Sequence, residues 1–307
     1  MFEKSALLFI YVETPLHAGT GRGLGAVDLP IQRERVTQYP MIQASSLKGK
    51  LRAEVRLRNN WQDDSPEITA LFGKAGDADN TFSGAVAPGD ARVLLFPVRS
   101  LAGVLAWTTS LHVLQRFARD CAFANLTPPL LLRTSPGAGE AFVTSDAVKA
   151  GDYVVLEDFS FKPISEHSKS LRELAQWVVD HALPNTHAYW RKQIVDKLVV
   201  LPEDAFRDFA LYATEVQTHV RLDPARKTVQ PGALWTTESL PPDTLLYAPL
   251  MVSQSRVDSK TWNADNVLTK LKEVLGDKRV QLGGDETAGQ GWVTVRLVEA
   301  SANGGQR

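Results

Sequence analysis

The chain has 307 residues, of which 44% are hydrophobic and 22% are charged, with a formal net charge of −1 and one cysteine. This composition is typical of a globular protein; it excludes an internal disulfide and a surface that coats nucleic acid over its whole area, so any polyanion site must be local. No apolar run has the length of a bilayer span, and the lone cysteine favours a reducing environment, so we expect a cytoplasmic protein without a membrane partner.

Residues 6–12 are a continuous apolar, β-rich run, which predicts a first strand covered on both faces. Glu3 and Glu13 flank this run, so it does not resemble a secretory signal. The glycine-rich stretch HAGTGRGLGAVDLPIQRE follows at 17–34 and contains a single aspartate, Asp28. From spacing alone, Asp28 is either a solvated aspartate of a mobile loop or a functional carboxylate.

The glycines of this stretch do not predict a dinucleotide site. Gly21, Gly23 and Ala26 fit the G-x-G-x-x-G/A spacing, but such a site needs a helix that starts there and receives the pyrophosphate. Pro30 would remove a hydrogen bond in the second turn of that helix, and no acid stands at the ribose-binding distance. The chain also lacks the P-loop sequence.

Residues 46–58 have helical periodicity, with apolar side chains at Leu47, Leu51 and Val55. Ser45 or Ser46 can cap the helix start, and free amides there bind anions. The segment carries one acid, Glu54, against five cations: Lys48, Lys50, Arg52, Arg56 and Arg58. Because three of the cations recur every four residues, they predict a stripe that follows a phosphate backbone; the alternative is an ordinary solvated helix face.

The remaining segments predict an α+β fold. Residues 59–90 are a polar insertion; strands are expected at 91–98, 153–161, 214–222, 245–252, 279–282 and 292–298, and helices at 100–119, 171–183 and 264–275. The turn-rich residues 223–235 predict the exposed tip of a long hairpin with arms at 214–222 and 245–252, and Trp235 can stack on a base at that tip. Strand–helix–strand patterns at both ends favour one or two ferredoxin-like units, followed by a disordered tail at 301–307.

Histidine and cysteine spacing predicts no metal cage. The six histidines contain no H-x-x-x-H pair, and one cysteine does not build a zinc site. His17 stands beside the glycine-rich stretch, where it is either a proton carrier or a structural histidine.

Four motifs, taken together, resemble a known family. HAGTGRGLGAVDLPIQRE, PMIQASSLKGKLR, LLFPVRSLAGVLAWTTS and RLDPARKTVQPGALWTTESLPPDTLLY are similar, in this order, to the RAMP-superfamily backbone subunits of type III-B CRISPR-Cas (Cmr) effector complexes. The resemblance implies a single elaborated domain with an RRM-like (ferredoxin-like) palm, helical finger insertions and a β-hairpin thumb. The palm would comprise about 1–58, 91–160 and 245–300, the insertion 59–90, the helical region 165–212 and the thumb 214–245.

The resemblance also assigns roles to residues. Asp28 matches the catalytic, metal-binding aspartate, with His17 and Glu238 near the same site. Together with the helix and hairpin patterns above, it gives a predicted RNA-binding set of Ser45, Ser46, Lys48, Lys50, Arg52, Arg56, Arg221, Trp235, Gly283, Gly284, Gly289 and Gly291.

The implied activity is metal-dependent RNA cleavage at regular intervals, with Mg²⁺ or Mn²⁺ as the divalent cofactor. The implied partners are CRISPR RNA, complementary target RNA, further copies of the chain in a helical stack and other Cmr-type subunits. Two alternatives stay open at this point: a non-catalytic RNA-binding subunit, which the presence of Asp28 speaks against, and a guide-processing RAMP endoribonuclease that acts through histidine, which the long thumb speaks against.

Overall fold

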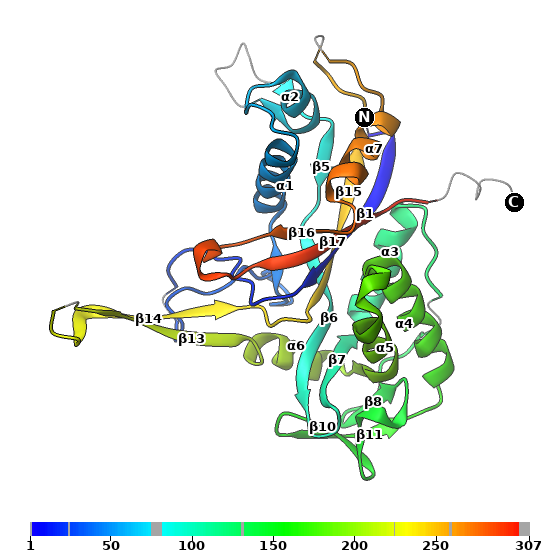
Figure 1. The fold of residues 1–307 in the computed structure, drawn as a ribbon. Helices are drawn as coiled ribbons and strands as arrows, with labels where there is room; N and C mark the ends of the chain where they lie inside the picture. The colour runs from blue at the N-terminus through cyan, green and yellow to red at the C-terminus, as the bar shows by residue number, and fades with distance from the viewer. Residues whose placement is uncertain are drawn as a thin grey trace, which may run out of the picture.

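The computed structural model describes residues 2–23, 25–74, 82–129, 132–223, 225–257 and 260–300, so the tail expected at 301–307 lies outside the described residues. Strand β1 (Lys4–Val12) lies between β15 (Leu245–Val252) and β17 (Trp292–Val298), and both neighbours are antiparallel to it. β16 (Lys278–Gln281) extends the sheet beyond β17, and β6 (Ala91–Ser100) extends it beyond β15. The order β16-β17-β1-β15-β6 places strands from both ends of the chain side by side (Figure 1).

Helices cover both faces of this sheet. On one face, α3 (Leu111–Phe123) and α4 (Ser168–Ala182) pack through an aromatic cluster in which the Phe117 ring meets Phe9 at 6.1 Å and Tyr247 at 5.0 Å. On the other, α1 (Ala44–Arg58) and α7 (Ala264–Leu275) bury their apolar stripes. Since β1 is fully buried from Ala6 onward, the expectation of a strand covered on both faces is confirmed.

The second half of β6 belongs to a closed ring of strands below the main sheet. From β6 the ring runs through β7 (Val104–Ser110), β12 (Leu198–Leu201), β8 (Glu140–Val143), β11 (Phe159–Ile164) and β10 (Tyr153–Leu156), and it closes where Leu156 pairs with Ser100. The helix expected at 100–119 is therefore wrong in its first half. Val104 to Thr108 pair with β6, and the helix begins only at Leu111, where the Ser110 hydroxyl accepts a hydrogen bond from the Val113 amide at 3.4 Å.

A two-stranded hairpin projects from the body (Figure 1). It consists of β13 (Glu215–Leu222) and β14 (Val229–Ser239), whereas β15, expected as its second arm, belongs to the main sheet. The turn-like residues before Trp235 are part of β14. They fit there because Gly232 adopts a φ of 73°, a backbone conformation that other residues in a strand rarely adopt. Trp235 faces His219 partway along the hairpin, so its expected place at the tip is wrong.

The remaining elements connect these parts. The helices are α2 (Pro66–Phe72), α5 (Ala188–Lys197) and α6 (Glu203–Tyr212), with single turns η2 (Asp146–Val148), η3 (Asn185–His187) and η4 (Glu286–Ala288). The short strands are β2 (Met41–Ile42), β3 (Gly73–Lys74), β4 (Phe82–Ser83), β5 (Val86–Pro88) and β9 (Lys149–Ala150). The insertion at 59–90 thus contains a packed helix, since α2 buries Ile68, Leu71 and Phe72.

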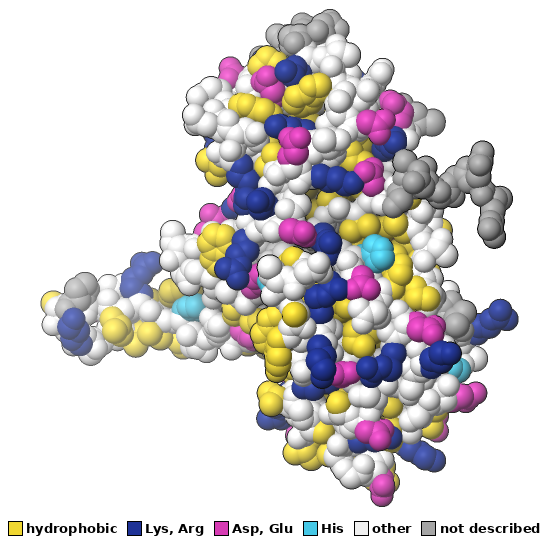
Figure 2. All heavy atoms as spheres, turned by 45° about the vertical axis from the view of Figure 1, so that its right-hand side comes forward, with side chains coloured by type: hydrophobic (Ala, Val, Ile, Leu, Met, Phe, Trp, Pro, Cys, Tyr) yellow, Lys and Arg dark blue, Asp and Glu magenta, His cyan; other side chains and the backbone are white. Residues whose placement is uncertain are grey.

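The surface does not carry one dominant charge. Figure 2 shows basic and acidic side chains interspersed over the body, while hydrophobic side chains follow one edge of the hairpin. The exposed apolar residues of the hairpin are Val216, Val220, Leu222, Val229 and Leu234. Within the described ranges, no helix has both the length and the apolar character needed to cross a bilayer.

Candidate nucleic-acid interface

Asp28 is fixed against the base of the hairpin. The backbone of Leu29 pairs with β14, donating to the Thr236 carbonyl and accepting from the Glu238 amide, each at 3.0 Å. One carboxylate oxygen of Asp28, Oδ2, accepts from the Thr236 amide at 2.8 Å and from the Thr236 hydroxyl at 2.9 Å. These bonds hold the pKa of Asp28 below its usual range, so an exposed, ionised carboxylate stands at a defined position.

Glu238 is placed differently from a catalytic acid. Its side chain is only 6% exposed, and it forms an ion pair with Arg33 at 2.5 Å. It also accepts hydrogen bonds from the Ile31 amide at 3.0 Å and the Thr214 hydroxyl at 2.8 Å. These contacts give Glu238 a structural role, because they tie the segment that follows Asp28 to the base of the hairpin, and its catalytic role stays a prediction.

His17 lies between the hairpin and the C-terminal glycine-rich loop. Its Nδ1 is 2.6 Å from the Glu238 carbonyl oxygen, and its own carbonyl accepts from the Gly284 amide at 2.8 Å. A Cβ atom on Gly283 would stand 2.4 Å from that carbonyl, and one on Gly291 would stand 1.9 Å from the Leu282 carbonyl. Gly283, with a φ of 83°, therefore lets the loop approach His17, and Gly291, with a φ of 77°, lets the loop close against Leu282. Gly289 also has a positive φ, of 80°, but its Cβ would meet nothing within 4 Å.

A hollow of about 390 Å³ opens beside His17 at the start of α1. It is lined by six residues that the sequence motifs predict to act on RNA, although they are far apart in the chain: His17, Ser45, Ser46, Lys50, Gly283 and Gly284. Gln43, and not a serine, is the N-cap of α1, and Asp90 accepts from the Ala44 amide at 2.8 Å. The serines instead stand in the first turn, where free helix amides favour an anion.

The cations of α1 do not form a uniform stripe. Arg52 donates to the carbonyls of Gly73 and Asp63, both at 2.6 Å, so it anchors the insertion. Lys50 forms an ion pair with Glu286 of the glycine-rich loop. Lys48 has no ion pair among the described residues, and burial, followed by the nearby Arg52, lowers its pKa. Lys48 and Arg52 line a separate hollow of about 950 Å³ near α2, and Arg56 is half-buried on the same helix.

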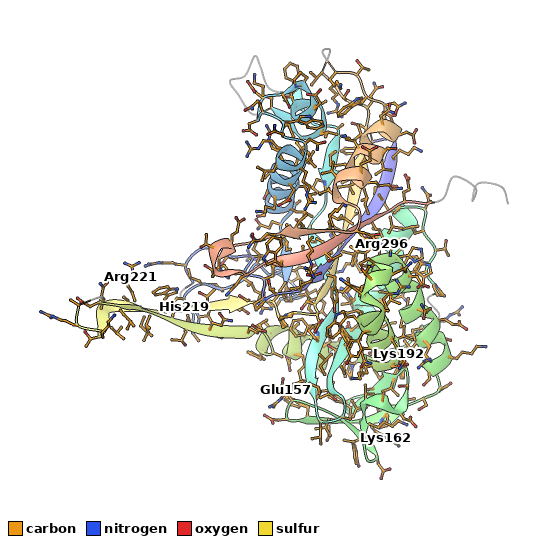
Figure 3. The ribbon with its side chains drawn as sticks, in the orientation of Figure 1. Glu157, Lys162, Lys192, His219, Arg221 and Arg296 are labelled. Atoms are coloured by element: carbon orange, nitrogen blue, oxygen red, sulfur yellow. The ribbon has the colours of Figure 1, made fainter. Side chains whose placement is uncertain are left out.

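The hairpin presents the other predicted RNA contacts. The Trp235 ring stacks on His219 with 5.4 Å between ring centroids and 16° between planes. Arg221 is exposed further out on β13, beyond His219 (Figure 3). Trp235 is half-buried by this stacking, so one of its faces is already covered.

Sequence reasoning missed two residues that build the site. Thr236 holds Asp28, and Arg33 neutralises Glu238 and donates to the Ala210 carbonyl at 2.8 Å. Arg33 stands within the quoted VDLPIQRE motif, but its partner is more than two hundred residues away. Only the fold brings the pair together.

A divalent ion at Asp28 would have one protein ligand among the described residues. The described residues contain no group of three or more His, Cys, Asp or Glu side chains that can hold a metal ion. Both bonds to the Asp28 carboxylate use Oδ2, so Oδ1 is open as far as the described residues show. A single oxygen fits a cation that takes its other ligands from phosphate and water.

Known proteins resemble this chain over nearly its whole length. The CRISPR system Cmr endoribonuclease Cmr4 of Pyrococcus furiosus is 36% identical over 98% of both chains. The crystal structure of oligomeric Cmr4 from the same organism superposes with a TM-score of 0.73 at 30% identity, covering 97% of this chain and 99% of the other. A chain of the type III-B Cmr-beta complex bound to cognate target RNA shares the fold, with a TM-score of 0.72 at 20% identity over 96% and 98% of the chains. The RAMP superfamily matches residues 9–294, and the chain belongs to this family.

Proposed function

We propose that this chain is the RNA-cleaving backbone subunit of a type III-B CRISPR interference complex. In this role it binds CRISPR RNA and cuts complementary target RNA at regular intervals. The observation that carries the proposal is the exposed, ionised Asp28, fixed by Thr236 at the base of a projecting hairpin. The 36% identity to a relative named an endoribonuclease, over 98% of both chains, supports it.

We propose that the hollow beside α1 holds the guide backbone. Ser45, Ser46 and Lys50 offer hydroxyls, free helix amides and a cation, while the glycine-rich loop lets a sugar-phosphate chain approach closely. Base pairing then reads the target sequence, and the protein contributes backbone and shape recognition. Copies of the chain and other Cmr-type subunits are the expected neighbours, in keeping with the oligomeric state named for the Pyrococcus furiosus structure.

The fold agrees with a ferredoxin-like palm. In the order β17-β1-β15-β6, the first strand of the chain lies between the last and the third, with α1 and α7 as the two crossover helices. All three pairings are antiparallel, as this topology requires. We assign the hairpin β13–β14 as the thumb and a cytoplasmic location to the whole, the latter because the only cysteine is buried and unpaired.

The proposed reaction is attack of a ribose 2′-hydroxyl on the adjacent phosphorus. The 5′-oxygen leaves, so the products are a 2′,3′-cyclic phosphate and a 5′-hydroxyl, and the proton lost by the attacking hydroxyl is balanced by the one that the leaving oxygen gains. The hairpin beside Asp28 can twist the nucleotide until the three reacting atoms are in line. Asp28 Oδ1 then accepts the proton or holds Mg²⁺ or Mn²⁺, which when bound neutralises charge on the phosphate.

The test is Asp28→Ala in the reconstituted complex. Because Asp28 is exposed, the variant is expected to retain guide RNA and subunit stoichiometry while target cleavage is lost. Asp152→Ala, an exposed aspartate with no ion pair among the described residues, is the matched control and should cleave normally. Equal loss of assembly would make Asp28 structural, and unchanged cleavage by Asp28→Ala would refute the assignment.

A further inference from the structure

A third hollow, of about 470 Å³, is lined by residues close in the chain to those that line the hollow at α1. It is formed by Tyr11, Glu13, Trp190, Asp243, Arg279 and Trp292, together with Thr14 and His187. Glu13 stands four residues before His17, and Arg279 stands three residues before Leu282, so adjoining parts of the same two segments line the two hollows. None of these residues has a role in the cleavage site described above.

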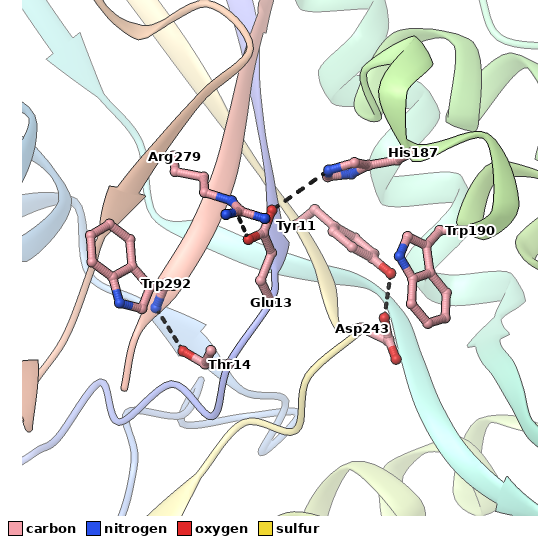
Figure 4. A pocket seen from close by; sticks show the side chains of 8 residues that line it. All are labelled: Tyr11, Glu13, Thr14, His187, Trp190, Asp243, Arg279 and Trp292. Carbon is pink, nitrogen blue, oxygen red and sulfur yellow. Dashed lines mark hydrogen bonds and ion pairs between the residues drawn. The ribbon is translucent and has the colours of Figure 1, made fainter. Parts of the chain in front are cut away.

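Its walls are aromatic. Trp190 of α5 and Trp292 of β17 stand on opposite sides of the hollow, with Tyr11 and Glu13 between them (Figure 4). Both indoles remain 38–39% exposed, although such large rings are normally well covered. Two partly exposed indoles that face a shared space provide surfaces on which a flat ring can stack.

The charges of the hollow exclude a phosphate and suit an uncharged ring. Arg279 is its one full cation, and it is already paired with Glu13 at 2.7 Å. Asp243 adds a carboxyl group, which accepts from the Tyr11 hydroxyl and whose pKa burial raises. The floor therefore offers hydrogen-bond acceptors and donors without a net positive charge, as a nucleobase edge requires and a phosphate does not.

The hollow is also connected to the hairpin. The Gln290 side chain donates to Gln217 of β13 at 3.2 Å, and Gln290 is two residues from Trp292. The Gln217 side of the hairpin is the side that carries the His219–Trp235 stack. A strand that crosses the glycine-rich loop thus meets aromatic surfaces both on the hairpin and in this hollow.

We propose that this hollow receives unpaired nucleobases of the RNA that crosses the glycine-rich loop, with the exposed faces of Trp190 and Trp292 as its stacking surfaces. The inference rests on the proposed RNA-binding function and adds a base-binding subsite to it. Removing an aromatic platform weakens single-stranded binding by about 1–3 kcal/mol per base, which is roughly five- to 150-fold in Kd.

The test compares two probes on the full chain: an oligocytidine and an abasic ribose-phosphate chain of equal length. The unmodified protein should bind the oligocytidine more tightly, by roughly five-fold or more, and Trp190→Ala and Trp292→Ala should each reduce that preference. Trp190→Phe, which keeps an aromatic face, should restore it. Tyr212→Ala removes a highly exposed aromatic residue that lies outside the hollow, and it should leave the preference unchanged.

The outcomes separate this inference from the proposed function. Equal binding of both probes by the unmodified protein, or a preference that survives both tryptophan variants, would overturn the subsite while leaving backbone binding intact. Failure to bind either probe would count against RNA binding itself. If the tryptophan variants instead lower self-association in sedimentation without changing the preference, the hollow receives a second copy of the chain, and the nucleobase assignment is wrong.

Discussion

Replacing Glu238 by alanine should lower the free energy of unfolding by about 3–5 kcal/mol, because the Arg33 side chain, which is only 13% exposed, then loses its carboxylate partner. The hydrogen bonds to Ile31 and Thr214 are lost in the same change. Glu238→Gln keeps the volume and an acceptor oxygen but removes the charge, so it should cost about 1–3 kcal/mol. At roughly 2 °C per kcal/mol for a chain of this size, Tm should fall by about 6–10 °C for alanine and about 2–6 °C for glutamine.

Thermal unfolding and target cleavage should be measured on the same preparations. Since Glu238 holds the Ile31 amide three residues from Asp28, cleavage should decline together with stability, while the pH profile of the residual activity stays the same. Glu215→Gln is the matched control: it removes a carboxylate at the same end of the hairpin that has no ion pair among the described residues. This control should keep both its Tm and its activity.

One combination of results would refute the structural role of Glu238. If Glu238→Gln unfolds at the temperature of the unmodified protein, yet cleavage is lost and its pH profile changes, the carboxylate acts on the RNA directly. The buried position of Glu238 would then have to open in the assembled complex.

Four further variants probe the neighbouring contacts. Thr236→Val removes a hydroxyl that lowers the pKa of Asp28, so this pKa should rise toward its ordinary value and the acidic limb of the cleavage profile should move to higher pH; an unmoved limb would mean that another group titrates. Lys48→Ala should reduce the slope of the logarithm of the RNA-binding constant against the logarithm of the salt concentration by roughly one, with little change in Tm. Arg52→Ala should instead lower the free energy of unfolding by roughly 1–3 kcal/mol, because it frees the insertion. The opposite pattern would contradict an RNA-binding role for Lys48 and an anchoring role for Arg52. Gly49 lies on an exposed helix face, where a Cβ meets nothing within 4 Å, and it lines the hollow at α1. Gly49→Ala should therefore stabilise the fold by about 1 kcal/mol yet weaken RNA binding. Unchanged binding would mean that the guide does not occupy the hollow at α1.

Local patterns predicted the elements whose own residues carry a clear apolar or glycine-rich signal. The buried first strand, the helix at Leu47, Leu51 and Val55, and the C-terminal glycine-rich loop all lie where the sequence places them. Errors arose where tertiary pairing overrides a local pattern. The sequence pattern places Val104 to Ser110 in a helix, but strand pairing, chiefly with β6, makes this segment a strand. Gly232 signals a turn, yet it lies within β14.

In the candidate site, too, some features are visible in the local sequence and others appear only in the fold. Motifs found Asp28 and the residues around the hollow at α1, because a carboxylate, serines and glycines are visible as residue types. They could not show that Arg52 anchors the insertion or that Glu238 is buried, since the partners Asp63, Gly73 and Arg33 are identified only by the fold. Residue type thus predicted which positions cluster, and hydrogen-bonding partners decided which of them remain free to act.

The most direct test of the whole account is cleavage of complementary RNA by the reconstituted complex, with and without EDTA. The account predicts a ladder of evenly spaced products that ends in cyclic phosphates and disappears when EDTA removes the divalent ion. Intact RNA in the presence of Mg²⁺ or Mn²⁺, or a single cut in place of a ladder, would contradict a repeated Asp28 site along the guide.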